Sequence, residues 1–260
     1  STLKWTEDKL KVPVIDHWWQ TESGWPMLAN MVGVELAKVK PGSATFPVCG
    51  YDIQILNEDG EVLGPNSEGY VVVKLPLPPG NLRNIWGNPQ RFQAGYLERF
   101  PGYYFSGDGG YKDEEGYVFI TGRVDDVINV AGHRLSTAEM EEIVASHSQV
   151  AECAVIGIND DLKGQIPLAL AVTKSGNEIA ESVIQSEIIK EIRSQIGPVA
   201  SLKQVILVSR LPKTRSGKIL RKLLRGIADN EDYSVPSTID DPLIIDEISK
   251  AYRTHKIGSN

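Results

Sequence analysis

The stretch Leu211-Pro212-Lys213-Thr214-Arg215-Ser216-Gly217-Lys218 decides how the second half of this chain folds. Residues 204–208 before it are rich in branched apolar side chains and predict a strand. The residues after it predict a helix with one apolar face, formed by Ile219, Leu220, Leu223, Leu224 and Ile227. Pro212 and Gly217 predict a turn between strand and helix, so Lys218 would be a movable point charge at that turn.

The same alternation of strands and helices continues upstream of this turn. Ser136 followed by Glu139 is a capping-box signature in front of an apolar helical stripe. Two apolar runs, residues 153–158 and 167–172, predict buried strands. A later helix has isoleucines at every fourth position and ends at Gly197-Pro198. This part of the chain therefore predicts a compact α+β domain.

Residues 40–74 show a different pattern, in which short runs of β-forming residues alternate with turn signals. Residues 52–56 and 70–73 predict strands, and their spacing predicts an antiparallel sheet or a small barrel. A proline-rich loop and a hairpin turn at residues 113–116 then lead into a strand that ends near Gly122. We place a domain boundary shortly after that strand.

Composition excludes several classes of protein. The chain has 260 residues and a net charge of −7, which argues against general affinity for nucleic acid or anionic membranes. Its two cysteines are too few for a disulfide framework or a zinc cage. No apolar run approaches the roughly 20 residues of a membrane span, and there is no secretion signal. We expect a soluble, cytoplasmic protein, or one of the mitochondrial matrix in a eukaryote.

Two further blocks lie upstream of the lysine turn. One is Asp16-His17-Trp18-Trp19-Gln20-Thr21-Glu22-Ser23-Gly24, and the other runs from Tyr103-Tyr104-Phe105-Ser106-Gly107-Asp108 through residues 121–134. Together the three blocks resemble the adenylate-forming acyl-CoA synthetases, most closely the short-chain propionyl-CoA and acetyl-CoA synthetases. The resemblance implies that residues 1–125 are the C-terminal part of a large, AMP-binding N-terminal domain. Residues 126–260 would then be the compact, mobile α+β C-terminal domain of the same enzyme.

The resemblance also implies roles for residues that handle the nucleotide. Lys218 would be the catalytic lysine, whose charge bridges the substrate carboxylate and the α-phosphate of ATP. Asp108 would accept hydrogen bonds from the ribose hydroxyls, and Glu22 would bind Mg²⁺ through a carboxylate oxygen. The full set of nucleotide-binding residues would be Asp16, His17, Trp18, Gln20, Thr21, Asp108, Arg123 and Arg134.

Other residues would handle the acyl group and coenzyme A. Trp19 would form the floor of the acyl pocket, where its volume excludes long acids. Asp125 would be a hinge about which the smaller domain turns. The coenzyme A arm would pass over Ala131 and Gly132, and Arg193 would lie near the phosphates of coenzyme A.

Each of these residues also has an ordinary structural interpretation. Lys218 could be an exposed loop lysine, and Asp108, which follows a predicted turn at Ser106 and Gly107, could cap a turn beside Gly109 and Gly110. Arg123 and Arg134 could be ordinary surface ion-pair partners, and Arg193 could lie on the solvated face of its helix. The tryptophans at positions 18, 19 and 25 could form a core aromatic cluster, and this remains the better account of at least one of them.

The resemblance thus implies an ATP-dependent propionate–CoA ligase that releases AMP and pyrophosphate. The alternatives are an acetate–CoA ligase, a ligase for longer or aryl acids, and a non-catalytic nucleotide-binding module. A lysine acetyltransferase and deacetylase acting on Lys218 would be further partners. The chain lacks an initiator methionine and the Ser/Thr/Gly-rich phosphate loop of this family. We therefore expect it to be the C-terminal part of a longer enzyme and inactive alone.

Overall fold

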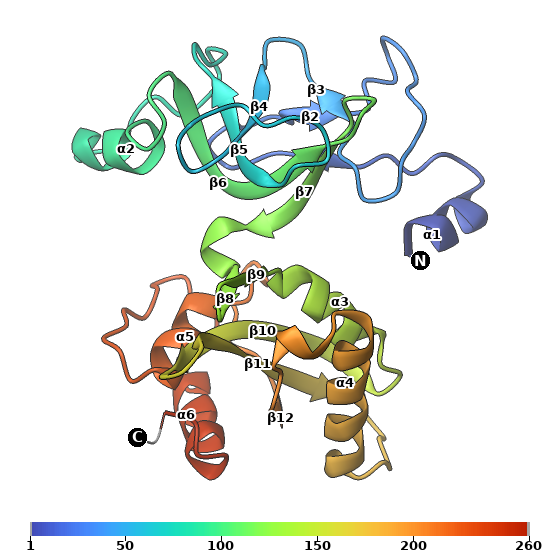
Figure 1. Ribbon diagram of the computed structural model, residues 1–260, viewed down its shortest axis with the longest axis vertical. Coiled ribbons are helices and arrows are strands. Elements are labelled where there is room, and N and C mark those ends of the chain that lie inside the picture. Colours follow the sequence, from blue (N-terminus) through green and yellow to red (C-terminus); the bar gives the residue numbers. More distant parts are fainter. Residues whose placement is uncertain (1, 259–260) are drawn as a thin grey trace. The chain divides into compact units, whose positions relative to one another are not determined.

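The computed structural model describes residues 2–258. The chain divides into two compact units, residues 1–125 and residues 126–260 (Figure 1). The boundary falls within a short 3₁₀ turn, Val124–Asp126. We describe each unit by itself.

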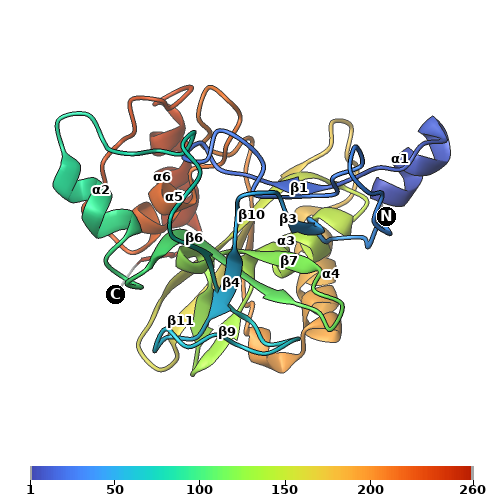
Figure 2. The same ribbon diagram turned by 90° about the horizontal axis from the view of Figure 1, so that it is seen from above.

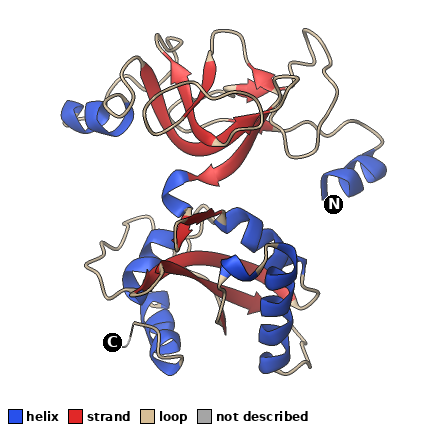
Figure 3. Cartoon of the chain, viewed as in Figure 1, coloured by secondary structure: helices blue, strands red, loops and turns tan. Residues whose placement is uncertain are grey.

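The first unit is built on a four-stranded antiparallel sheet (Figure 3). Its strands pair in chain order and are β4 (Ile53–Leu56), β5 (Gly69–Lys74), β6 (Tyr103–Lys112) and β7 (Val118–Arg123). Apolar side chains of β4 and β5 pack into a core that also receives Trp18, Met27 and Leu28. Of the two arrangements expected for this region, the antiparallel sheet is therefore the one that forms.

Strand β6 contains a bulge where the sequence had indicated a turn. Val72 pairs with Phe105 and the adjacent Val71 pairs with Asp108, so Ser106 and Gly107 are extra residues in the ladder. The Ser106 hydroxyl donates to the Val71 carbonyl at 2.6 Å and accepts the Asp108 N–H at 3.0 Å. Gly107 has φ +75°, a conformation that glycine adopts without strain. The prediction that Ser106 and Gly107 form a loop turn was wrong, because the strand continues through both.

Smaller elements surround this sheet. A second antiparallel sheet contains β1 (His17–Trp18), β2 (Leu28–Ala29) and β3 (Phe46–Pro47), in that order. Two helices, α1 (Thr2–Leu10) and α2 (Pro89–Tyr96), were not predicted. Asn88 caps α2 by accepting the Arg91 N–H at 3.0 Å, and Pro89 occupies the first turn, where its missing donor costs nothing.

The second unit is a five-stranded mixed sheet with helices on both faces (Figures 1 and 2). The strands are β8 (Ile128–Val130), β9 (His133–Leu135), β10 (Val150–Asp160), β11 (Gly164–Thr173) and β12 (Val205–Leu207). The order is β10-β11-β8-β9, with β12 parallel to β11. The helices are α3 (Thr137–Ser146), α4 (Glu181–Gln195), α5 (Arg221–Ala228) and α6 (Ile244–Thr254).

Strand alternation divides the core of the second unit into two layers. Val155 faces a cluster with α3 and α4, whereas Ala154 and Ile156 face a cluster with α5 and α6. Ser136 caps α3 by accepting the Glu139 N–H at 3.3 Å, as the capping signature predicts. Helix α4 ends before Gly197, whose φ is +103°, and a short 3₁₀ turn, Pro198–Ala200, follows.

Candidate functional site

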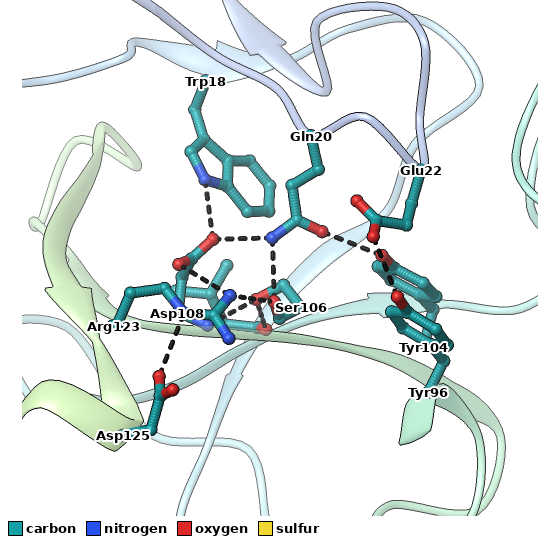
Figure 4. A network of polar contacts seen from close by, with 10 residues as sticks. Trp18, Gln20, Glu22, Tyr96, Tyr104, Ser106, Asp108, Arg123 and Asp125 are labelled. Carbon is teal, nitrogen blue, oxygen red and sulfur yellow. Dashed lines mark hydrogen bonds and ion pairs between the residues drawn. The ribbon is translucent and has the colours of Figure 1, made fainter. Parts of the chain in front are cut away.

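The first unit gathers a polar network around the Asp108 carboxylate (Figure 4). Asp108 is only 7% exposed. Its Oδ2 accepts the indole N–H of Trp18 at 3.0 Å and the side-chain N–H of Gln20 at 2.8 Å. Gln20 also donates to the Ser106 carbonyl at 2.8 Å. A loop near residue 20 and the bulged strand β6 thus meet at one buried carboxylate, although about 90 residues separate them.

Arg123 completes the network from the neighbouring strand. It pairs with Asp108 across β6 and β7, and its guanidinium lies 3.5 Å from Asp108 Oδ1. It donates to the Ser106 carbonyl at 3.1 Å and to Asp125 Oδ1 at 3.0 Å. A Cβ on Gly107 would lie 2.6 Å from the Arg123 guanidinium. Glycine is therefore needed at this bulge for the approach of Arg123 as well as for the backbone torsion.

The charge of the network is set by burial. Burial raises the pKa of Asp108, while Arg123 and the hydrogen bonds from Trp18 and Gln20 oppose that rise. Because both protein hydrogen bonds go to Oδ2, the other oxygen, Oδ1, retains acceptor capacity beside the guanidinium. The pair Asp108 and Arg123 thus offers an acceptor next to a cation, a combination suited to hydroxyl groups of a ligand.

Two tyrosines that the sequence did not single out extend the network. The Tyr104 hydroxyl donates to Gln20 Oε1 at 2.8 Å, and the Tyr96 hydroxyl donates to Glu22 Oε1 at 2.8 Å. Their rings stack with centroids 5.5 Å apart and planes 5° apart. Burial raises the pKa of both tyrosines, so both hydroxyls stay protonated donors. Tyr96 was missed because it lies on α2, which was not predicted.

The remaining predicted residues near position 20 do not join this network. Asp16, His17 and Thr21 are exposed, and Asp16 accepts the backbone N–H of His17 at 2.7 Å. Trp19 is 53% exposed, whereas Trp18 is 9% exposed within the core. The structural interpretation of a core tryptophan therefore holds for Trp18, whose indole also orients Asp108.

Glu22 is the predicted metal-binding residue. It is half-buried, and one of its oxygens carries the hydrogen bond from Tyr96. Within residues 2–258, no group of three or more His, Cys, Asp or Glu side chains could together hold a metal ion. A single carboxylate still fits Mg²⁺, because this ion takes oxygen ligands and keeps several of its waters. Phosphate groups of a substrate commonly supply further oxygen ligands.

The second unit carries Lys218 directly after a tight turn. Thr214 donates its N–H to the Lys218 carbonyl at 2.8 Å, and Gly217 donates to the Thr214 carbonyl at 2.8 Å. The Lys218 side chain is exposed, and within the described part of the chain its ammonium has no hydrogen-bond or ion-pair partner. The turn therefore fixes the backbone and leaves the charge free to meet an anion.

The predicted coenzyme A residues occupy two other places in the second unit. Ala131 and Gly132 form the two-residue loop between β8 and β9, with φ +49° and φ +87°. Two residues with positive φ are typical of a type I′ hairpin. Arg193 lies in the last turn of α4 and lines a hollow of about 220 Å³ together with Lys203. Arg134 is exposed on β9, opposite Asn129.

The structure thus brings together some predicted residues and not others. Trp18, Gln20, Asp108, Arg123 and Asp125 form one network in the first unit. Ala131, Gly132 and Arg134 belong to the β8–β9 hairpin of the second unit, whereas Arg193 lies on α4 and Lys218 precedes α5. Within residues 2–258, no helix is long and apolar enough to cross a membrane.

Comparison with known proteins identifies the family. Residues 139–218 match the AMP-binding enzyme C-terminal domain. Over 96% of its length the chain is 48% identical to acyl-CoA synthetase short-chain family member 3, mitochondrial, of Pongo abelii. Also over 96%, it is 44% identical to propionate–CoA ligase of Escherichia coli. Over nearly its whole length the chain is thus homologous to part of the short-chain acyl-CoA synthetases, and residues 139–218 form an AMP-binding enzyme C-terminal domain.

Two further comparisons set the extent of this likeness. An uncharacterized protein of Pseudomonas aeruginosa is 54% identical over 99% of the chain. The crystal structure of the anthranilate CoA ligase AuaEII with anthranoyl-AMP superposes with a TM-score of 0.72 at 26% identity, covering 86% of this chain and 41% of that one. The α+β fold prediction is thereby confirmed. The chain spans 41% of the Pseudomonas and Escherichia proteins and 36% of the Pongo protein.

Proposed function

We propose that the whole protein is an ATP-dependent short-chain acyl-CoA synthetase that converts propionate to propionyl-CoA. The observation that carries this proposal is the buried Asp108 carboxylate, oriented by Trp18 and Gln20 and faced by Arg123. That arrangement suits a ribose, whose hydroxyls donate to Asp108 Oδ1 while Arg123 contacts the sugar. Asp16, His17, Thr21 and Arg134 would complete the nucleotide site.

In the first half-reaction, a carboxylate oxygen of the acid attacks the α-phosphorus of ATP. The bond from that phosphorus to pyrophosphate breaks, and an acyl-adenylate forms. Lys218 holds its ammonium between the two anions and stabilises the charge that develops on the phosphate oxygens. The free ammonium on a fixed turn supports this role. Glu22 would hold Mg²⁺, which supplies further charge neutralisation at the phosphates.

In the second half-reaction, the sulfur of coenzyme A attacks the acyl carbonyl carbon. The thiol proton is lost, the bond to the AMP oxygen breaks, and the thioester and AMP leave. We assign Ala131 and Gly132 to the coenzyme A arm and Arg193 to its phosphates. Asp125, the last residue before the boundary between the two units, would be the hinge between the two half-reactions.

The acid is proposed to be short because of Trp19. Its indole is 53% exposed within the first unit and is therefore available to line a ligand pocket. A bulky floor leaves room for propionate or acetate and excludes longer or aryl acids. The name of the Escherichia coli relative supports propionate as the preferred acid.

The proposal is tested on the whole protein with ATP, coenzyme A and a panel of acetate, propionate, butyrate and benzoate. We expect propionyl-CoA and AMP as the main products. Lys218→Ala should abolish pyrophosphate release and spare thioester formation from supplied propionyl-adenylate. Lys222→Ala, which removes another exposed lysine four residues away, is the matched control. Absence of any AMP-forming ligation by the wild-type protein would overturn the proposal.

Three finer assignments accompany this function. The exposed ammonium of Lys218 would be a substrate for a lysine acetyltransferase and a deacetylase, because acetylation removes the charge that adenylation needs. Mass spectrometry of the purified protein should then find acetyl-Lys218. The protein would act in the cytoplasm. The 260-residue chain alone should adenylate poorly, since no Ser/Thr/Gly-rich phosphate loop lies among its residues.

A further inference from the structure

The turn that carries Lys218 is the end of a small three-stranded ribbon. The first arm is residues 212–214 and the second arm is residues 218–220. The two arms pair through a bridge between Lys213 and Ile219, and the Leu220 N–H donates to the Pro212 carbonyl at 2.9 Å. On the outer side, residues 238–240 pair with the first arm. The backbone N–H of Arg215 donates to the Thr238 carbonyl at 3.0 Å, and the backbone N–H of Asp240 donates to the Lys213 carbonyl at 2.9 Å. Both edges of the first arm are therefore occupied by backbone hydrogen bonds.

The outer strand of the ribbon is itself held in place. Ile239 is 5% exposed and packs in the core layer with α5 and α6. Asp241 pairs with Arg210 at 2.7 Å, and Arg210 also pairs with Glu247 on α6. These contacts tie residues 238–240 to the core of the unit. They therefore also fix the first arm of the turn, which pairs with those residues.

The second arm, which carries Lys218, has less support. Lys218 accepts the Thr214 N–H at its carbonyl, at 2.8 Å. Its own N–H donates to the Thr214 hydroxyl at 3.1 Å, and that hydroxyl also contacts the Ser216 hydroxyl at 3.0 Å. Thr214 therefore holds both backbone groups of Lys218. The Thr214 hydroxyl accepts the Lys218 N–H, a donor that the backbone pairing of the two arms does not use.

We propose that Thr214 is a positioning residue for Lys218, an inference that rests on the proposed function. Its hydroxyl ties the backbone of Lys218 to the fixed arm, so that the flexible side chain starts from one defined Cα position. A lysine has four rotatable side-chain bonds, and backbone freedom would multiply the conformations that miss the reacting phosphate. Removing the hydroxyl should therefore slow the step that needs the Lys218 charge and leave the other half-reaction unaffected.

The experiment compares variants of the whole protein in the two half-reactions. Thr214→Val keeps the shape of the side chain and removes its hydroxyl, whereas Thr214→Ser keeps the hydroxyl. Thr254→Val is the matched control, because it removes a threonine hydroxyl from α6 that, among the residues the structure describes, bonds only to the Lys250 carbonyl. Adenylation is followed by pyrophosphate release from ATP and propionate. Thioester formation is followed from purified propionyl-adenylate and coenzyme A.

We expect Thr214→Val to lower kcat of adenylation about tenfold, with the KM for ATP and the thioester step unchanged. Thr214→Ser should retain most of the wild-type rate, and Thr254→Val all of it. Adenylation by Thr214→Val at the wild-type rate would overturn the inference. So would an equal loss in both half-reactions, accompanied by a lower melting temperature, since that describes a structural role. A wild-type protein that forms no acyl-adenylate would instead refute the proposed function.

Discussion

The Tyr96 hydroxyl donates a hydrogen bond of 2.8 Å to the Glu22 carboxylate, and the two residues lie 74 positions apart. The bond occupies one oxygen of Glu22 and leaves the other for a ligand. Mutation of a residue that hydrogen-bonds a metal ligand typically lowers metal affinity about 10- to 100-fold.

Tyr96→Phe should therefore weaken the binding of Mg²⁺ while preserving the ring stack with Tyr104. We expect the Mg²⁺ concentration for half-maximal activity to rise about tenfold. Binding of Mn²⁺ at fixed ATP, followed by electron paramagnetic resonance, gives a readout independent of turnover. Tyr104→Phe is the control, because its hydroxyl bonds to Gln20 rather than to Glu22. Equal metal dependence in the two variants would contradict this assignment.

The raised pKa of Asp108 predicts a pH dependence of nucleotide binding. A protonated Asp108 loses acceptor capacity at the oxygen that carries the proton, so ATP affinity should fall as the pH drops toward its raised pKa. The fall should begin above the ordinary value of 3.8, because burial favours the neutral form. Asp108→Asn should bind ATP weakly and show no such dependence. Calorimetric titrations at several pH values distinguish these outcomes.

The raised pKa of Asp108 has the opposite consequence for stability, because protonation of Asp108 weakens nucleotide binding but favours the folded state. A carboxyl whose pKa is raised on folding stabilises the folded state at a pH below its unfolded value. That contribution is lost as the pH rises through the folded pKa. Asp108 therefore contributes less to stability at neutral pH than at low pH. If ATP affinity of the wild-type protein were unchanged down to pH 3.8, the predicted role of Asp108 would be wrong.

The hairpin at Ala131 and Gly132 separates a backbone requirement from a coenzyme A requirement. A Cβ on Gly132 would meet no atom within 4 Å, so Gly132→Ala should lower the free energy of unfolding only through the positive φ, by about 1 kcal/mol. Ala131→Gly should cause no such loss, because glycine accepts φ +49° without strain.

Activity measurements on the same two variants test the proposed coenzyme A contact. If the pantetheine arm passes over Gly132, Gly132→Ala should impair thioester formation well beyond its effect on stability. Adenylation by this variant should stay at the wild-type rate. Thioester formation by Gly132→Ala at the wild-type rate would remove Gly132 from the coenzyme A site.

Trp19 should determine the length of the acid that the enzyme accepts. Trp19→Ala should permit turnover of butyrate and longer acids, with a gain of about 10- to 200-fold for each methylene admitted. The melting temperature should change little because the side chain is 53% exposed. Trp25→Ala, which removes a tryptophan that is 65% exposed, is the control and should leave the acid preference unchanged. A Trp19 variant with wild-type selectivity would place the acyl pocket elsewhere.

Regular elements with a strong pattern were predictable from the sequence. Isoleucines 184, 188 and 192 are buried on α4 as their spacing predicts, and Ser136 begins α3. Helix α2 carried a usable signal, since Asn88 followed by proline favours a helix start. Helix α6 carried another in the four-residue spacing of Ile244, Ile248 and Tyr252. Neither helix was predicted, although the sequence carries both signals.

The contacts within the candidate site depended on tertiary structure. Nothing local indicates that the indole of Trp18 reaches Asp108, because that contact joins residues 90 positions apart. The Ser106-Gly107 bulge was also unpredictable, since the same residues favour an ordinary turn until the pairing of β5 with β6 is known. Residue types could therefore suggest ligands for the nucleotide, but not the residues that orient those ligands.

The bulge in β6 also limits how this protein can change in length. Side chains of a strand alternate between two faces, so deleting one residue between Phe105 and Asp108 would turn the acidic side chain away from Trp18 and Gln20. The number of residues in this segment is therefore constrained together with their identity, because the number aims the carboxylate.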